Sequence, residues 1–173
     1  MYSVNKELII RSSSEAVDFA LLKDGKLIEL HKEQETSNFQ VGDIFIDKIR
    51  KPVAGLNAAF VNVGYEKDAF LHYHDLGPNL ASQLKFIKLV SAGKIKDFSL
   101  KNFQFEKEID KDGTITDVLN ANQSVLVQVV KEPISTKGPR ISAELSLAGR
   151  FIVLVPFSDR VSISQKIEDK KEK

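Results

Sequence analysis

The chain has 173 residues, which is enough for one or two small domains and too few for a large multidomain enzyme. Hydrophobic residues make up 42% and charged residues 28%, as in ordinary globular proteins, so a disordered chain, a collagen-like repeat and a coiled coil are excluded. The 25 Lys and Arg residues and the 24 Asp and Glu residues give a net charge of +1, so a charged partner would have to meet a local patch.

The chain has no cysteine, which excludes disulfides, thiolate metal sites and a cysteine nucleophile within it. The absence of disulfides fits a reducing compartment, so the cytoplasm is the expected location. Residues 1–7 lack the apolar core of a signal peptide, and no apolar run approaches the roughly 18 residues of a membrane span. We therefore expect no membrane span.

The first elements in the chain are strands. Apolar runs at 7–11, 15–22 and 26–30 predict them, and Asp24-Gly25 between the last two runs is a strong hairpin signal because a tight turn needs positive φ. After a polar junction, shorter strand-like runs follow at 43–50, 58–63 and 69–73. Their spacing predicts a small antiparallel barrel or sandwich.

A helix then interrupts the strands. Asn79 can cap it, apolar residues recur at helical spacing to Val90, and Gly93 stops it, so the helix is expected over 79–92. Residues 94–114 are highly charged and predict an exposed excursion that its aromatic residues Phe98, Phe103 and Phe105 hold down. A strand at 125–130, a loop at 131–140 and a strand-like run at 150–155 follow, and the charged residues from 165 onward are expected to be solvated.

Strand alternation places two phenylalanines on the polar faces of neighbouring strands. Successive side chains of a strand point to opposite faces. Phe60 therefore points to the face opposite that of Ala59 and Val61, and Phe70 points to the face opposite that of Ala69 and Leu71. Exposed aromatics on such a barrel can stack on unpaired bases, which contributes about 1–3 kcal/mol per base. The alternative is that the helix at 79–92 covers this side and both rings belong to the core.

Three cations surround the loop that follows the strand at 125–130. Lys131, Lys137 and Arg140 could neutralise phosphates, and Gly138 could let the backbone approach one closely. The alternative is an ordinary solvated turn. The loop does not have the spacing of Gly, Lys and Ser/Thr that a P-loop needs.

No catalytic or metal-binding set emerges from the residue pattern. His72 and His74 share a strand face near Asp75, but no third ligand has suitable spacing, so we expect no metal site. The sequence contains no Gly-x-Ser-x-Gly elbow and no evident pair of carboxylates on rigid strands. No catalytic residue is predicted.

Several runs resemble the N-terminal part of the ribonuclease E/G family, in order and spacing, and the resemblance extends to about residue 167. They are AAFVNVG at 58–64, KDAFLH at 67–72, VQVVKEP at 127–133, TKGPR at 136–140 and SLAGRFIVLVP at 146–156. Family members cut single-stranded RNA, mature ribosomal RNA and degrade messages. The resemblance implies a mainly β chain. Its centre would be an S1 RNA-binding domain of OB-fold type, which forms a five-stranded antiparallel barrel with an inserted helix. A β-hairpin of an RNase H-like domain would precede this barrel, and part of a sensor for the RNA 5′ end would follow it.

The implied boundaries are 1–37 for the RNase H-like segment, 38–142 for the S1 domain with a divergent insertion at about 77–117, and 143–173 for the start of the sensor region. Phe60, Phe70 and Lys137 occupy positions that hold RNA in the family, and Lys131 and Arg140 would assist. The family's Mg²⁺-binding aspartates and its Cys-x-x-Cys zinc link, which joins subunits in some members, would lie beyond Lys173.

The chain is therefore expected to be an N-terminal fragment that binds single-stranded RNA without cleaving it and needs no cofactor of its own. Hydrolysis would need metal-bound carboxylates, which the resemblance places in the rest of the parent ribonuclease. That parent would be a Mg²⁺-dependent enzyme and could form a homo-oligomer. The alternative, suggested by the neutral charge balance, is an assembly segment that docks on the missing catalytic domains or on another subunit.

Overall fold

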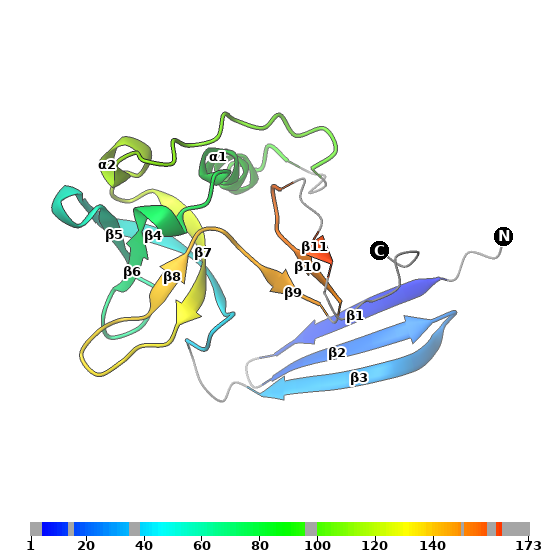
Figure 1. Ribbon diagram of the computed structural model, residues 1–173. Helices are drawn as coiled ribbons and strands as arrows, with labels where there is room; N and C mark the ends of the chain where they lie inside the picture. Colours follow the sequence, from blue (N-terminus) through cyan, green and yellow to red (C-terminus); the bar gives the residue numbers. More distant parts are fainter. Residues whose placement is uncertain are drawn as a thin grey trace. The chain divides into compact units, whose positions relative to one another are not determined.

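A computed structural model describes residues 5–13, 16–34, 39–95, 100–149, 151–158 and 162–163 of the chain. The chain divides into two compact units, Met1–Asn38 and Phe39–Lys173 (Figure 1). We describe each unit by itself. The division into domains at 1–37, 38–142 and 143–173 stays a prediction.

The first unit is a three-stranded antiparallel sheet in the order β1-β2-β3. Its strands are β1 (Lys6–Ser12), β2 (Ala16–Lys23) and β3 (Lys26–Gln34). Asp24 and Gly25 have φ values of 49° and 75°, which confirms the tight turn predicted between β2 and β3. The outer strands carry large exposed apolar side chains: Leu8, Ile9, Ile10, Leu27, Ile28 and Leu30.

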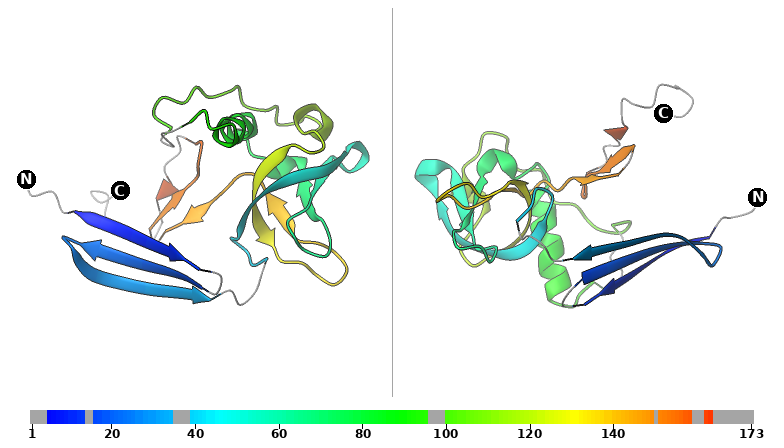
Figure 2. Two further views of the ribbon diagram at one scale, coloured as in Figure 1. Left: turned by 180° about the vertical axis from the view of Figure 1, so that it is seen from behind. Right: turned by 90° about the horizontal axis from the view of Figure 1, so that it is seen from below.

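The second unit contains a closed five-stranded barrel in the order β4-β5-β6-β8-β7 (Figure 2). Its strands are β4 (Ile44–Val53), β5 (Ala58–Val61), β6 (Ala69–His72), β7 (Ser124–Lys131) and β8 (Arg140–Ser142). The expectation of an entirely antiparallel barrel is wrong, because β6 and β8 pair in parallel. A closed ring with an odd number of strands cannot alternate in direction all the way round, so at least one neighbouring pair must be parallel.

The barrel interior is filled by side chains that alternate along these strands. Ala59 and Val61 of β5, Leu71 of β6 and Ile141 of β8 have no exposed surface. The β7 side chains of Val125, Val127 and Val129 are also buried. The period of two in the sequence therefore assigns the inner face correctly. A short 3₁₀ turn follows β4 (η1, Ala54–Leu56) and another follows β6 (η2, Tyr73–Asp75).

The connection from β6 to β7 contains α1 (Leu80–Ser91), an irregular segment and the short helix α2 (Ile115–Val118). The helix expected over 79–92 is confirmed as α1, whereas α2 was not predicted. The irregular segment lies along α1: the Lys85 ammonium donates to the carbonyl of Gln104 at 2.8 Å, and the rings of Phe86 and Phe103 are 5.6 Å apart. Phe103 and Phe105 thus help to hold this segment, and Phe98 lies outside the described residues.

Tyr73 fixes the far end of this irregular segment. Its side chain is only 3% exposed and its hydroxyl donates to the carbonyl of Asp110. Gly113 packs so closely that an added Cβ would lie 2.2 Å from the tyrosine oxygen. The segment is therefore seated on the end of the barrel by specific contacts.

Burial and the nearby carboxylate of Asp110 raise the pKa of Tyr73 above its usual value of 10.0. The unfolded chain therefore releases this proton at a lower pH than the folded protein. The contribution of the protonated Tyr73 hydroxyl to the free energy of unfolding is complete below about pH 10 and is lost as the pH rises through the folded pKa. In urea unfolding at a series of pH values, Tyr73→Phe should show a smaller loss of unfolding free energy above about pH 10 than the unmodified chain. Parallel losses in both proteins would contradict this.

A second small sheet follows the barrel, with strands β9 (Leu147–Ala148), β10 (Ile152–Leu154) and β11 (Ser162–Ile163) in the order β11-β10-β9. The strand-like run predicted at 150–155 is confirmed in its central part as β10. Within the described part of the chain, none of the helices has the length and apolar character that crossing a membrane requires.

Candidate nucleic-acid interface

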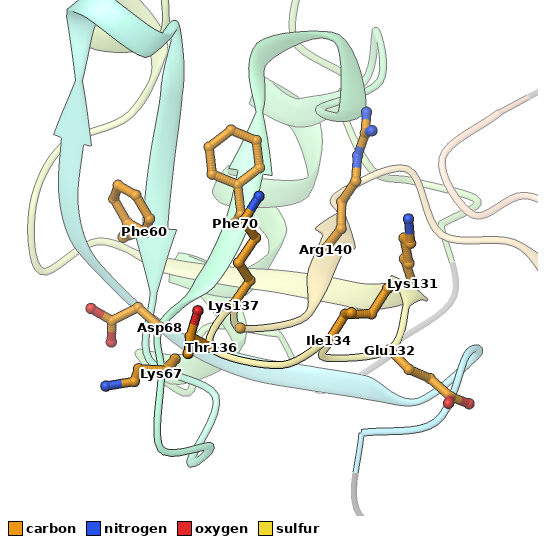
Figure 3. Close-up of a pocket in the computed structure, with 11 residues that line it drawn as sticks. Phe60, Lys67, Asp68, Phe70, Lys131, Glu132, Ile134, Thr136, Lys137 and Arg140 are labelled. Carbon is orange, nitrogen blue, oxygen red and sulfur yellow. The ribbon is translucent and has the colours of Figure 1, made fainter.

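The five residues singled out from the sequence line a single open pocket of about 600 Å³ on the barrel (Figure 3). Phe60 comes from β5 and Phe70 from β6, Lys131 ends β7, Lys137 lies in the loop between β7 and β8, and Arg140 begins β8. Residues up to 80 positions apart in the sequence thus line the same pocket.

The two phenylalanine rings form a pair on the outer surface of the barrel. Phe60 and Phe70 face each other in the β5–β6 ladder, so their side chains share a face. Their ring centroids are 5.8 Å apart with an interplanar angle of 67°. Both are partly exposed, whereas their neighbours Ala59 and Leu71 are fully buried.

The alternative in which the helix buries these rings is wrong. No residue of α1, and none of the described residues of the 94–114 segment, lines the pocket. The helix contacts β7 and buries Leu80 and Ile87 on its own packing face. Within the second unit, the described residues therefore leave the face that carries Phe60 and Phe70 open.

The cations of the pocket differ in their partners. Lys131 and Lys137 are exposed, and within the described ranges neither forms an ion pair. The Arg140 guanidinium instead donates to the Asp75 carboxylate through Nε at 2.9 Å and Nη2 at 3.1 Å. Because Asp75 offsets its charge, Arg140 offers a weaker field to an anion than the two lysines do.

Arg140 also belongs to the parallel β6–β8 pair of the barrel. It pairs with Phe70 in the parallel β6–β8 ladder, and its bidentate contact with Asp75 joins β8 to the turn η2 that follows β6. Two acidic residues of the pocket are directed elsewhere: Asp68 pairs with Arg50 at 3.0 Å, and Glu132 points away from the rings in Figure 3. The open surface beside the rings is therefore positively charged.

Gly138 has a different role from the one expected. An added Cβ would lie 2.2 Å from the carbonyl oxygen of Asp68 and 2.8 Å from that of Lys67, so the glycine packs on the backbone of the β5–β6 connection. Beside it, the buried Pro139 accepts a 2.8 Å hydrogen bond from the Phe70 amide. These contacts fix the base of the loop next to Phe70.

Sequence reasoning missed five further residues of the pocket wall, which are Lys67, Asp68, Glu132, Ile134 and Thr136. Lys67 points away from the ring pair in Figure 3. The signal for Ile134 was a large apolar side chain within a polar, glycine-containing loop. Its exposure became evident only from the structure, where it is 55% exposed.

The two histidines next to Phe70 extend its row of rings. The His72 ring lies 6.3 Å from Phe70, and His74 lies 5.0 Å from His72. The His72 Nδ1 accepts a hydrogen bond from the His74 amide at 3.2 Å. Nowhere in the described ranges do three His, Cys, Asp or Glu side chains gather in a way that could hold a metal ion.

The chain is similar in sequence to proteins named as ribonucleases. Ribonuclease G of Salmonella typhimurium (strain SL1344) is 30% identical over 167 residues, covering 96% of this chain and 30% of that protein. Ribonuclease G of Escherichia coli (strain K12) matches with the same figures. A ribonuclease E/G-like protein of Pyropia yezoensis is 38% identical over 138 residues, covering 79% of this chain and 22% of that protein.

The chain belongs to the ribonuclease E/G family. The resemblance seen in the sequence motifs is thereby confirmed, although no family model matches the chain. This family member spans about 30% of the length of the ribonuclease G relatives. Its pocket joins two aromatic rings to the ammonium groups of Lys131 and Lys137, which form no ion pair with any described residue, an arrangement that can stack on flat apolar groups and attract anions.

Proposed function

We propose that this chain is a single-stranded RNA-binding portion of a ribonuclease E/G-type endoribonuclease that acts in ribosomal RNA processing and message decay in the cytoplasm. In this proposal Phe60 and Phe70 stack on bases and Lys137, assisted by Lys131 and Arg140, contacts phosphates. The observation that carries it is the open Phe60–Phe70 pair beside Lys131 and Lys137, which form no ion pair within the described ranges. Arg140 contributes least to the attraction because it is paired with Asp75.

The barrel would be the S1 domain of OB-fold type. OB-fold barrels bind oligonucleotides on the face of their second and third strands and with the loop that joins their fourth and fifth strands. Here the second and third strands of the barrel are β5 and β6, which carry the two rings, and the loop from β7 to β8 carries Lys137. By the same resemblance, we assign β1–β3 to an RNase H-like domain and the residues from about 143 onward to the 5′ sensor.

The proposed function is binding without cleavage. In the full-length enzyme we expect carboxylates elsewhere to hold Mg²⁺ for hydrolysis, and thiolates to hold Zn²⁺ where the zinc link exists. This chain supplies no thiolate because it has no cysteine. The catalytic activity, the RNA substrates and any homo-oligomer therefore belong to the proposal for the whole protein.

The test is a fluorescence anisotropy titration of the chain with a short labelled oligouridylate at several salt concentrations. Each neutralised phosphate of a single strand contributes about −0.7 to the slope of log K against log salt, so Lys131 and Lys137 predict a slope of about −1.4. Lys137→Ala should make that slope shallower by about 0.7, and Arg140→Ala by less. Failure to bind at low salt would reject the proposal, and Mg²⁺-dependent cutting by the purified chain would reject binding without cleavage.

A second candidate function is assembly. The exposed apolar side chains of β1 and β3, together with Ile152 and Leu154 of β10, favour docking on other domains of the parent ribonuclease or on another subunit. Sedimentation velocity at increasing protein concentration distinguishes the two functions. Self-association without any affinity for RNA would favour assembly over RNA binding.

A further inference from the structure

The tip of the loop between β7 and β8 is a tight two-residue turn. The Lys137 amide donates to the Ile134 carbonyl at 3.0 Å, and the Ile134 amide donates to the Lys137 carbonyl at 3.3 Å. Ser135 within the turn has a positive φ of 54°, as such turns require. Residues that face each other across this kind of bridge project from the same face, so the Ile134 and Lys137 side chains lie side by side.

Both side chains lie on the wall of the pocket and are exposed. Ile134 is 55% exposed, although a large apolar side chain is stabilised by burial. Lys137 is exposed and forms no ion pair with any described residue. In the view of Figure 3, Ile134 lies between Lys137 and Lys131.

The base of the loop that carries this tip is fixed next to the rings. Gly138 packs on the backbone carbonyls of Lys67 and Asp68, and the Pro139 carbonyl accepts the Phe70 amide. A wall that is already in place loses little freedom when a ligand binds, which favours affinity. Ile134 is therefore carried by a loop whose base is held in place beside Phe70.

We propose that Ile134 and Lys137 together form a second nucleotide position beside the Phe60–Phe70 pair, which rests on the RNA-binding function proposed above. Each nucleotide joins a base, whose flat faces can pack against apolar groups, to a phosphate, and the loop tip offers an apolar side chain next to an ammonium group on one face. Ile134 packs against the face of a base while Lys137 pairs with the adjoining phosphate. The pocket then holds two consecutive nucleotides, whose bases must be unpaired and unstacked for their faces to be reached.

The test compares Ile134→Ala with Lys137→Ala in the oligouridylate titration. Ile134→Ala should weaken binding about three- to tenfold at every salt concentration and leave the salt slope unchanged, because only apolar contact is lost. Lys137→Ala should change the slope. Ile134→Leu should retain nearly full affinity, and Ile134→Asn, which has the same number of side-chain heavy atoms but is polar, should weaken binding as the alanine does.

The matched control is Ile46→Ala. Ile46 is an isoleucine of β4 that is 59% exposed and does not line the pocket, so its loss should leave RNA affinity unchanged. Thermal unfolding of each variant shows whether it is folded. If the unmodified chain binds RNA and Phe70→Ala weakens binding, but Ile134→Ala binds normally or alters the salt slope, the second nucleotide position is rejected while RNA binding stands. If the unmodified chain does not bind RNA, the proposed function itself fails.

Discussion

Phe60→Ala or Phe70→Ala should weaken the affinity of the chain for unstructured RNA by about fivefold to about 150-fold, because stacking of one base on one ring contributes about 1–3 kcal/mol. The rings are partly exposed and 5.8 Å apart, so each presents surface to a ligand. Anisotropy titration at constant salt measures the change. The salt slope should stay the same in both variants, because neither ring carries a charge.

Two further substitutions show whether the loss comes from these rings and from stacking. Phe105→Ala removes a ring that is 47% exposed and outside the pocket, so it should leave RNA affinity unchanged. Phe70→Trp keeps an aromatic face and should retain most of the affinity, whereas Phe70→Leu keeps only the apolar volume and should not. If both alanine variants bind as tightly as the unmodified chain, the ring pair is not the RNA-binding surface.

Gly138→Ala should lower the free energy of unfolding by about 1–3 kcal/mol, the usual cost of forcing an extra methyl into a packed site. The added Cβ would lie 2.2 Å from the carbonyl oxygen of Asp68 and 2.8 Å from that of Lys67. Both are backbone atoms that cannot rotate away as a flexible side chain could. Because the loop must shift to relieve the clash, Lys137 and Ile134 move from their places and RNA affinity should fall as well.

Gly55→Ala is the matched control for this substitution. An added Cβ at Gly55 would meet no atom within 4 Å, so its stability and its affinity for RNA should stay close to those of the unmodified chain. Urea unfolding measures the stability of both variants. Equal unfolding free energies for Gly138→Ala and Gly55→Ala would show that the loop accommodates the methyl group and that its position is not fixed.

The outward direction of Phe60 and Phe70 could be predicted from the sequence because it depends on a local rule. Alternation assigns each residue of a strand to one of two faces, and the buried Ala59, Val61 and Leu71 identify the inner face. The turn at Asp24-Gly25 was predictable for the same reason, since its backbone requirement involves only adjacent residues. Whether the rings would be open to a ligand depended on where α1 packs, and that is decided by tertiary contacts.

The features that were missed depend on residues far apart in the chain. Asp75 and Arg140 are separated by 65 positions, and nothing local to Arg140 indicates that its charge is already paired. Gly138 was interpreted as a residue that lets a phosphate approach, because the backbone of Lys67 and Asp68 beside it could not be foreseen. The parallel β6–β8 pair has only two residue pairs, too short a run to leave a pattern in the sequence.

The contacts of the irregular segment at 94–114 bear on how this chain could diverge. Its described residues contact α1 through Lys85 and Ser82 and the end of the barrel through Tyr73, and none of them lines the pocket. Deletions, insertions and substitutions in this segment therefore leave the groups around Phe60 and Phe70 unchanged. The length of this segment can thus vary during evolution while selection maintains the nucleic-acid contacts.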